Sequence, residues 1–130
     1  MLVCHLSEGS RAPPLQRRAS AQVAVDRDTY GGSTVDLRSS RQYVDASERP
    51  LPLISKDFII DPIQIARAAS DGADAVLLIA AAAAADLPAL LDTCTVLGIE
   101  ALVEVHTPDE VTLASELGAS LLLVNQASRP

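Results

Sequence analysis

After residue 50 the chain alternates short apolar runs with helix-like segments, and this order limits the folds open to it. Four apolar runs begin near residues 51, 74, 99 and 119, so each interval of about 20–25 residues has room for one strand and one helix. The runs are almost continuously apolar, as expected of strands buried on both faces of a parallel sheet. The order predicts either an open, doubly wound sheet of the flavodoxin type or part of a closed (β/α) barrel.

Helix start and stop signals separate these runs. Asp61 followed by Pro62 is typical of an N-cap and a first helical residue. Thr107 and Glu110 have the spacing of a capping box. The middle segment has apolar residues at intervals of three and four, which indicate one buried helix face. The predicted helices cover about residues 61–70, 87–97 and 107–117.

Residues 1–50 are more polar and rich in turn-forming residues, and only "AQVAV" (21–25) has the pattern of a degenerate strand. We expect residues 1–24 to form a disordered leader. This stretch is rich in Arg, Ser and Ala and poor in acids, a composition also typical of organelle transit segments. The expected location is therefore the cytoplasm, or the plastid if the source is a photosynthetic eukaryote.

The charge of the chain limits the classes of molecule that it is expected to bind. The net charge is −7, and residues 51–130 carry one Lys and two Arg against eleven acidic residues. Such an acidic half disfavours binding to nucleic acid or to an anionic membrane surface. The longest apolar run, Ala75–Ala85, is well short of the ~18–20 residues of a membrane span. A small anionic ligand remains compatible, because it responds to local groups.

Three polar residues interrupt apolar strands near their carboxyl ends, where active sites of parallel βα folds lie: Lys56, Glu104 and Asn125. Lys56 is the only lysine of the chain, and it precedes the only phenylalanine, Phe58. Lys56 and Glu104 could be a structural ion pair or solvated strand ends, or an acid–base pair facing a pocket. His106 is interpreted as a polar residue beside a loop, without a role in the chemistry.

Several motifs together resemble the indole-3-glycerol-phosphate synthase family. They are "PLPLISKDFIIDPIQIARAASDGADAVLLIAA", "LGIEALVEVHTPDEV" and "LGASLLLVNQ", with "DRDTYGGSTVDLR" upstream. The resemblance covers roughly residues 25–126. It implies a (β/α)8 TIM barrel, so residues 25–130 are predicted to form part of such a barrel, about strands two to six.

The resemblance also implies an activity and roles for particular residues. Members of this family close the indole ring of 1-(2-carboxyphenylamino)-1-deoxyribulose 5-phosphate in tryptophan biosynthesis, releasing CO2 and water. They use no metal and no organic cofactor. By resemblance, Lys56 is the general acid of ring closure and Glu104 the proton acceptor of the dehydration. Phe58 packs on the aromatic ring of the substrate, and Asn125 orients a substrate hydroxyl.

The sequence also departs from the family pattern. The Glu, second Lys and Ser-Pro-Ser loop of the family's first strand are absent, and Ala127 stands where the family has Arg. A full barrel needs about 200–250 residues. The alternative interpretation is therefore an inactive fragment, or a half-barrel that associates with a complementary piece or with itself through exposed sheet edges.

Overall fold

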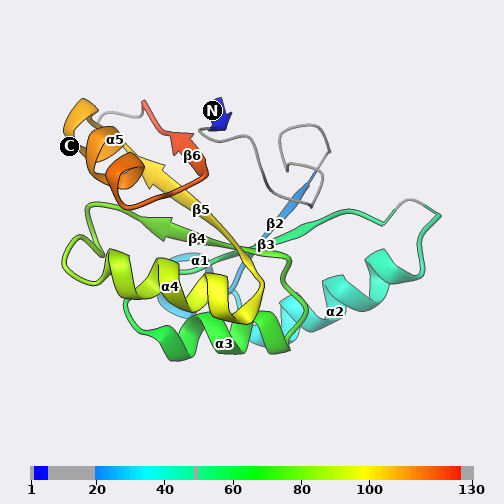
Figure 1. The fold of residues 1–130 in the computed structure, drawn as a ribbon. Helices are drawn as coiled ribbons and strands as arrows, with labels where there is room; N and C mark the ends of the chain where they lie inside the picture. Colours follow the sequence, from blue (N-terminus) through cyan, green and yellow to red (C-terminus); the bar gives the residue numbers. More distant parts are fainter. Residues whose placement is uncertain (1, 6–19, 49, 127–130) are drawn as a thin grey trace.

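A computed structural model describes residues 2–5, 20–48 and 50–126 (Figure 1). Six strands form one sheet in the order β1-β6-β5-β4-β3-β2. The strands are β1 (Leu2–His5), β2 (Ala21–Ala24), β3 (Leu53–Lys56), β4 (Ala75–Ile79), β5 (Glu100–Val105) and β6 (Leu121–Val124). The helices are α1 (Arg27–Tyr30), α2 (Thr34–Asp45), α3 (Pro62–Ser70), α4 (Leu87–Leu97) and α5 (Pro108–Glu116).

Strands β2 to β6 are parallel and lie side by side in chain order. A sheet wound in one direction like this places every connecting helix on the same face. The packing agrees, since the buried residues of α3, α4 and α5 form one cluster with Val76 of β4 and Val103 of β5. Leu37 of α2 packs in the same way beside Leu53. In Figure 1, α2, α3 and α4 lie together on one side of the strands.

The opposite face of the sheet carries a second apolar cluster to which none of the described helices contributes. Its members all come from strands: Ile54, Ala75, Leu77, Leu102, Leu121 and Leu123. A doubly wound sheet would have helices on this face as well, so that alternative is wrong. The prediction of a partial (β/α)8 barrel is confirmed, with the strand-only face as the inner wall.

The predicted helix starts are largely confirmed. Asp61 caps α3, and its carboxylate and Gln64 form a reciprocal capping box. Thr107 caps α5 by accepting from the backbone N–H of Glu110 at 3.2 Å. The capping box expected at α5 differs, because the Glu110 carboxylate accepts from the N–H of His106, one residue before the cap, at 2.6 Å. This contact ties α5 to the end of β5.

The structure adds elements that the sequence analysis did not predict. Helix α2 lies in the segment interpreted as polar and turn-rich, and β1 pairs antiparallel with β6. Residues 1 and 6–19 lie outside the described part, so the leader and the domain boundary near residue 25 stay predictions.

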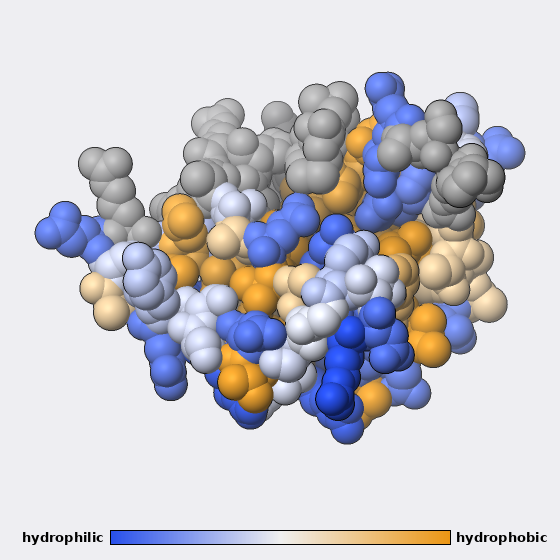
Figure 2. Space-filling view, turned by 180° about the vertical axis from the view of Figure 1, so that it is seen from behind, coloured by the Kyte–Doolittle hydropathy of each residue, from blue (hydrophilic) through white to orange (hydrophobic). Residues whose placement is uncertain are grey.

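On the surface shown in Figure 2, apolar side chains are interspersed with polar ones. None of the described helices has the length and apolar character required to cross a bilayer.

Candidate active site

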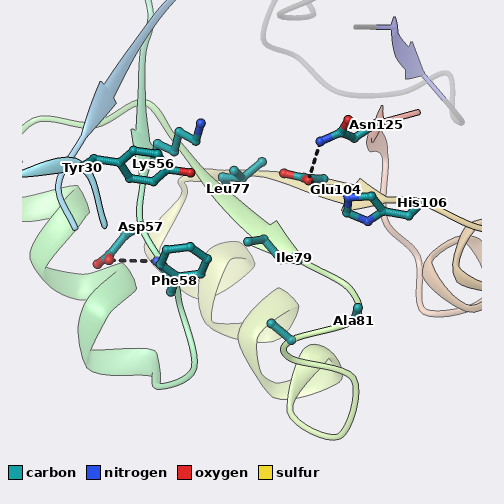
Figure 3. Close-up of a pocket in the computed structure, with 11 residues that line it drawn as sticks. Tyr30, Lys56, Asp57, Phe58, Leu77, Ile79, Ala81, Glu104, His106 and Asn125 are labelled. Carbon is teal, nitrogen blue, oxygen red and sulfur yellow. Dashed lines mark hydrogen bonds and ion pairs between the residues drawn. The ribbon is translucent and has the colours of Figure 1, made fainter. Parts of the chain in front are cut away.

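A pocket of about 410 Å³ lies where β3, β4, β5 and β6 end (Figure 3). Lys56 is the last residue of β3, Glu104 the last but one of β5, and Asn125 follows β6. Phe58 enters from the loop after β3. The structure thus brings all four predicted site residues to one pocket, on the face that also carries Leu77. Its lining is Tyr30, Lys56, Asp57, Phe58, Leu77, Ile79, Ala81, Ala82, Glu104, His106 and Asn125.

Lys56 does not pair with Glu104. Its Nζ instead lies 4.6 Å from the centroid of the Tyr30 ring, within the range of a cation–π contact. Within the described part of the chain, no carboxylate lies within ion-pair distance of this ammonium group. The alternative in which Lys56 and Glu104 form a structural ion pair is therefore wrong, and the lysine head is left available to a ligand.

Two aromatic rings form one side of the pocket. The rings of Tyr30 and Phe58 are nearly parallel, with an interplanar angle of 3° and 6.3 Å between centroids. The loop that carries Phe58 is held by Gln64, whose Nε2 donates to the carbonyl of Phe58 at 2.9 Å and to Asp57 at 3.3 Å. The helix cap of α3 therefore also fixes the position of Phe58.

Tyr30 reaches the pocket because the chain folds back directly after it. Gly31 adopts a left-handed conformation, with φ at 65°, and ends α1. The next residue, Gly32, approaches the end of β2 so closely that a Cβ would lie 2.0 Å from the carbonyl oxygen of Ala24. The two glycines thus hold the short helix, and with it Tyr30, against the strand ends.

Glu104 is a buried carboxylate, 9% exposed, with two side-chain nitrogens close to one of its oxygens. Asn125 Nδ2 donates to Oε1 at 3.0 Å, and His106 Nε2 lies 3.0 Å from the same oxygen. No hydrogen-bond partner of Oε2 is found among the described residues. The carboxylate is therefore held at one oxygen, while the other remains available to a ligand in the pocket.

Comparison with known proteins identifies the family. A sequence profile described as indole-3-glycerol phosphate synthase matches residues 10–128. The chain belongs to this family. The expectation drawn from the strand motifs is confirmed, and the match extends upstream of residue 25, where those motifs begin.

Curated relatives carry the same name. The indole-3-glycerol phosphate synthase of Roseiflexus castenholzii is 54% identical over 109 residues, covering 82% of this chain and 40% of the relative. That of Roseiflexus sp. (strain RS-1) is 46% identical with the same two shares. That of Saccharopolyspora erythraea is 44% identical over 104 residues, covering 79% of this chain and 37% of the relative. The chain thus spans about two fifths of the length of the curated relatives that it matches.

Seven of the eleven residues that line the pocket of this synthase-family chain are not among the predicted site residues, and two of the seven, Tyr30 and His106, contact predicted ones. Tyr30 lies in the upstream motif "DRDTYGGSTVDLR" but is given no role by the sequence analysis, and His106 is interpreted there as a polar residue beside a loop. The available signals were the glycine pair after Tyr30 and the two-residue spacing between Glu104 on β5 and His106 directly after it. The described residues contain no group of three or more His, Cys, Asp or Glu side chains placed to hold a metal ion.

Proposed function

We propose that this chain carries the acid and the base of an indole-3-glycerol-phosphate synthase acting in tryptophan biosynthesis. The substrate is 1-(2-carboxyphenylamino)-1-deoxyribulose 5-phosphate, and the reaction closes the indole ring with loss of CO2 and water. One observation carries the proposal: the Lys56 ammonium lines the same pocket as Glu104, and no described carboxylate pairs with it.

Ring closure requires a proton at the substrate carbonyl. The ring carbon that bears the carboxylate attacks the ketone carbon, and Lys56 Nζ gives a proton to the carbonyl oxygen as the new C–C bond forms. The C–C bond to the carboxylate then breaks, and its electron pair restores the aromatic ring as CO2 leaves. General acid catalysis of this kind contributes ~10²–10⁴-fold to the rate.

Dehydration requires a base. The hydroxyl formed from the carbonyl takes up a second proton from solvent and leaves as water. The adjacent ring carbon loses a proton to Glu104, which gives the indole double bond. Asn125 and His106 both lie at Oε1, which leaves Oε2 to accept this proton. Asn125 orients the departing hydroxyl from the same side of the pocket.

The rest of the pocket suits an aromatic substrate. Phe58 and Tyr30 offer aromatic faces, and Leu77 and Ile79 line the pocket between them and Glu104. Among the described residues that line the pocket, Lys56 is the only lysine or arginine. Because Lys56 gives its proton to the carbonyl oxygen in the proposed reaction, we place the phosphate group of the substrate outside the pocket, on groups that the lining does not include.

A second candidate is a half-barrel that is inactive until it associates with a complementary piece. The outer edge of β2 favours it, since no described strand pairs there. The chain also spans about two fifths of the length of its curated relatives.

The test joins residues 20–126 to the remaining segments of the Roseiflexus castenholzii relative and follows indole formation by fluorescence. Lys56→Ala should lower kcat by ~10²–10⁴-fold, because residues 20–126 hold no second lysine that could take its place at the end of β3. Lys56→Arg should not restore activity, since a guanidinium keeps its proton near neutral pH.

Arg67→Ala is the matched control, because Arg67 is an exposed cation that does not line the pocket. It should retain the parent activity. A Lys56→Ala protein as active as its parent would contradict the catalytic assignment.

A further inference from the structure

His106 has a place in the site that the proposed reaction does not yet use. Its ring lies at the pocket wall between two carboxylates from different elements. Nε2 is 3.0 Å from Glu104 Oε1, and Nδ1 is 3.6 Å from Glu110 Oε2. The side chains of His106 and Glu104 are each 12% exposed, so water screens their contact little.

The two nitrogens of the ring differ in what they can do. At 3.0 Å Nε2 is within hydrogen-bond distance of Glu104. An ionised carboxylate only accepts hydrogen bonds, so Nε2 must carry a proton for this contact to be favourable. Nδ1 lies too far from Glu110 for a hydrogen bond of normal length. The contact with Glu104 therefore requires a proton on Nε2.

Helix α5 fixes the backbone from which this ring extends. The Glu110 carboxylate accepts the N–H of His106 at 2.6 Å, while the N–H of Glu110 bonds to the Thr107 hydroxyl at 3.2 Å. The first turn of α5 thus holds residues 106 and 107, one contact each, at the β5–α5 junction.

We infer that His106 is a positioning residue for Glu104, and that Glu110 holds His106 in place. Together with Asn125, His106 fixes Oε1 of Glu104 and thereby aims Oε2 into the pocket. This inference rests on the proposed function, because the orientation of Glu104 affects the rate only if Glu104 acts as a base. The contacts themselves can be tested on the chain without any turnover.

The first measurement is NMR of the imidazole nitrogens in the 130-residue chain. The chain has two histidines, so His5→Gln leaves the signals of His106 alone. We expect the Nε2–H form and a slowly exchanging ring N–H proton. That proton signal should broaden or vanish in Glu104→Leu. The Nδ1–H form, or a ring N–H signal indifferent to Glu104→Leu, would overturn the inference whatever the activity of the protein.

The second measurement is kinetic and uses the active fusion described above. A misplaced base lowers kcat more than it weakens binding, so His106→Leu should lower kcat by about 10–100-fold with little change in KM. His106→Gln should recover most of the loss, because its amide N–H2 can reach the former position of Nε2. Equal losses in the two variants would show a packing role only.

Glu110→Gln and Glu116→Gln form a matched pair on α5. Glu116 is exposed at the far end of the helix, so its variant should keep the parent kcat. Glu110→Gln should lower kcat and broaden the ring N–H signal of His106. If the fusion has no activity while the ring signal is as expected, the proposed function fails and the positioning contact stands.

Discussion

At the scale of single residues, the partner of Lys56 differs from one of the expected ones. A carboxylate was expected, and an aromatic ring lies beside the ammonium group. The ammonium group faces the Tyr30 ring at 4.6 Å. Because Lys56 is the only lysine, lysine labelled with ¹³C and ¹⁵N gives NMR signals from this residue alone. Ring currents should shift the Hε protons of Lys56 upfield. Tyr30→Leu should remove the shift, and Tyr30→Phe should keep it, since both aromatic rings attract a cation.

Tyr43→Leu is the control for this measurement. Tyr43 is the other tyrosine of the chain and is 80% exposed on α2. Its replacement should leave the Lys56 signals unchanged. Lysine signals at random-coil positions in the parent chain would mean that the cation–π contact does not persist in solution.

Cys94 gives a second residue-scale prediction. Burial in α4 raises the pKa of its thiol from 9.0 to about 11. In a Cys4→Ser background, Cys94 should react with a disulfide reagent about 10²-fold more slowly in the folded chain than in urea, because the thiolate is the nucleophile. If Cys94 reacts as fast in the folded chain as in the unfolded chain, this prediction is wrong.

The same pKa shift links Cys94 to stability. A thiol whose pKa is higher in the folded state leaves stability unchanged below its unfolded pKa of 9.0. Stability then falls as the pH rises from 9.0 toward about 11, since the unfolded chain loses the proton first. Cys94→Ala should remove this part of the alkaline loss.

Some site residues could be predicted from the sequence and others could not. Lys56, Glu104 and Asn125 interrupt apolar strands, and a parallel sheet places the carboxyl ends of its strands together. The contacts of Tyr30 and His106 depend instead on how two loops fold over the strand ends. No periodic pattern of apolar residues in the sequence predicts that arrangement.

At the scale of elements, Asp74 lies at the amino end of β4 and connects this strand to β3 and to helix α2. Its Oδ2 accepts the N–H of the buried Leu53 at 2.8 Å and pairs with Arg41 of α2 at 2.9 Å. Asp74→Ala leaves the Leu53 N–H without this acceptor, so the free energy of unfolding should fall by ~1–3 kcal/mol. Urea denaturation followed by circular dichroism measures the loss.

Two control variants separate the loss of the acceptor for the Leu53 N–H from the loss of an ion pair. Asp74→Asn keeps an oxygen for the Leu53 N–H and should lose less than Asp74→Ala. Arg38→Ala removes an ion pair with Asp71 in which the arginine is 55% exposed, and exposed pairs contribute only ~0–1 kcal/mol. If Arg38→Ala costs as much as Asp74→Ala, the buried N–H is not the source of the effect.

The elements also show which sequence signals are strong. The strands from β3 onward and helices α3 to α5 follow from apolar runs with caps and glycine stops. Helix α2 buries only Leu37 and Val44, seven residues apart, so its apolar face was too sparse to recognise. Its cap, Ser33 with Asp36 three residues later, was the available signal. Strand β1 depends on a partner at the other end of the chain, which local pattern cannot reveal.

At the scale of the whole molecule, the sheet has two edges where a closed barrel has none. Strand β1 lies antiparallel on the outer edge of β6, where a closed barrel would continue with a parallel strand. The edge of β2 has no partner among the described strands. The N–H groups of Ala21 and Val25 bond inward, to Pro52 and Lys56. By strand alternation, the N–H of Gln22 points outward.

This arrangement predicts how a complementary piece would join the chain. Mixed with the remaining segments of the Roseiflexus castenholzii relative, the chain should form indole-glycerol phosphate, and neither part alone should do so. Gln22→Pro should weaken association by about tenfold, because it removes an outward N–H, and one backbone hydrogen bond contributes ~0.5–1.5 kcal/mol. Gln22→Ala keeps that N–H and is the control. Analytical ultracentrifugation and indole fluorescence measure association and turnover. Complementation unaffected by Gln22→Pro would exclude the β2 edge as the joining surface, and turnover by the chain alone would exclude the need for a partner.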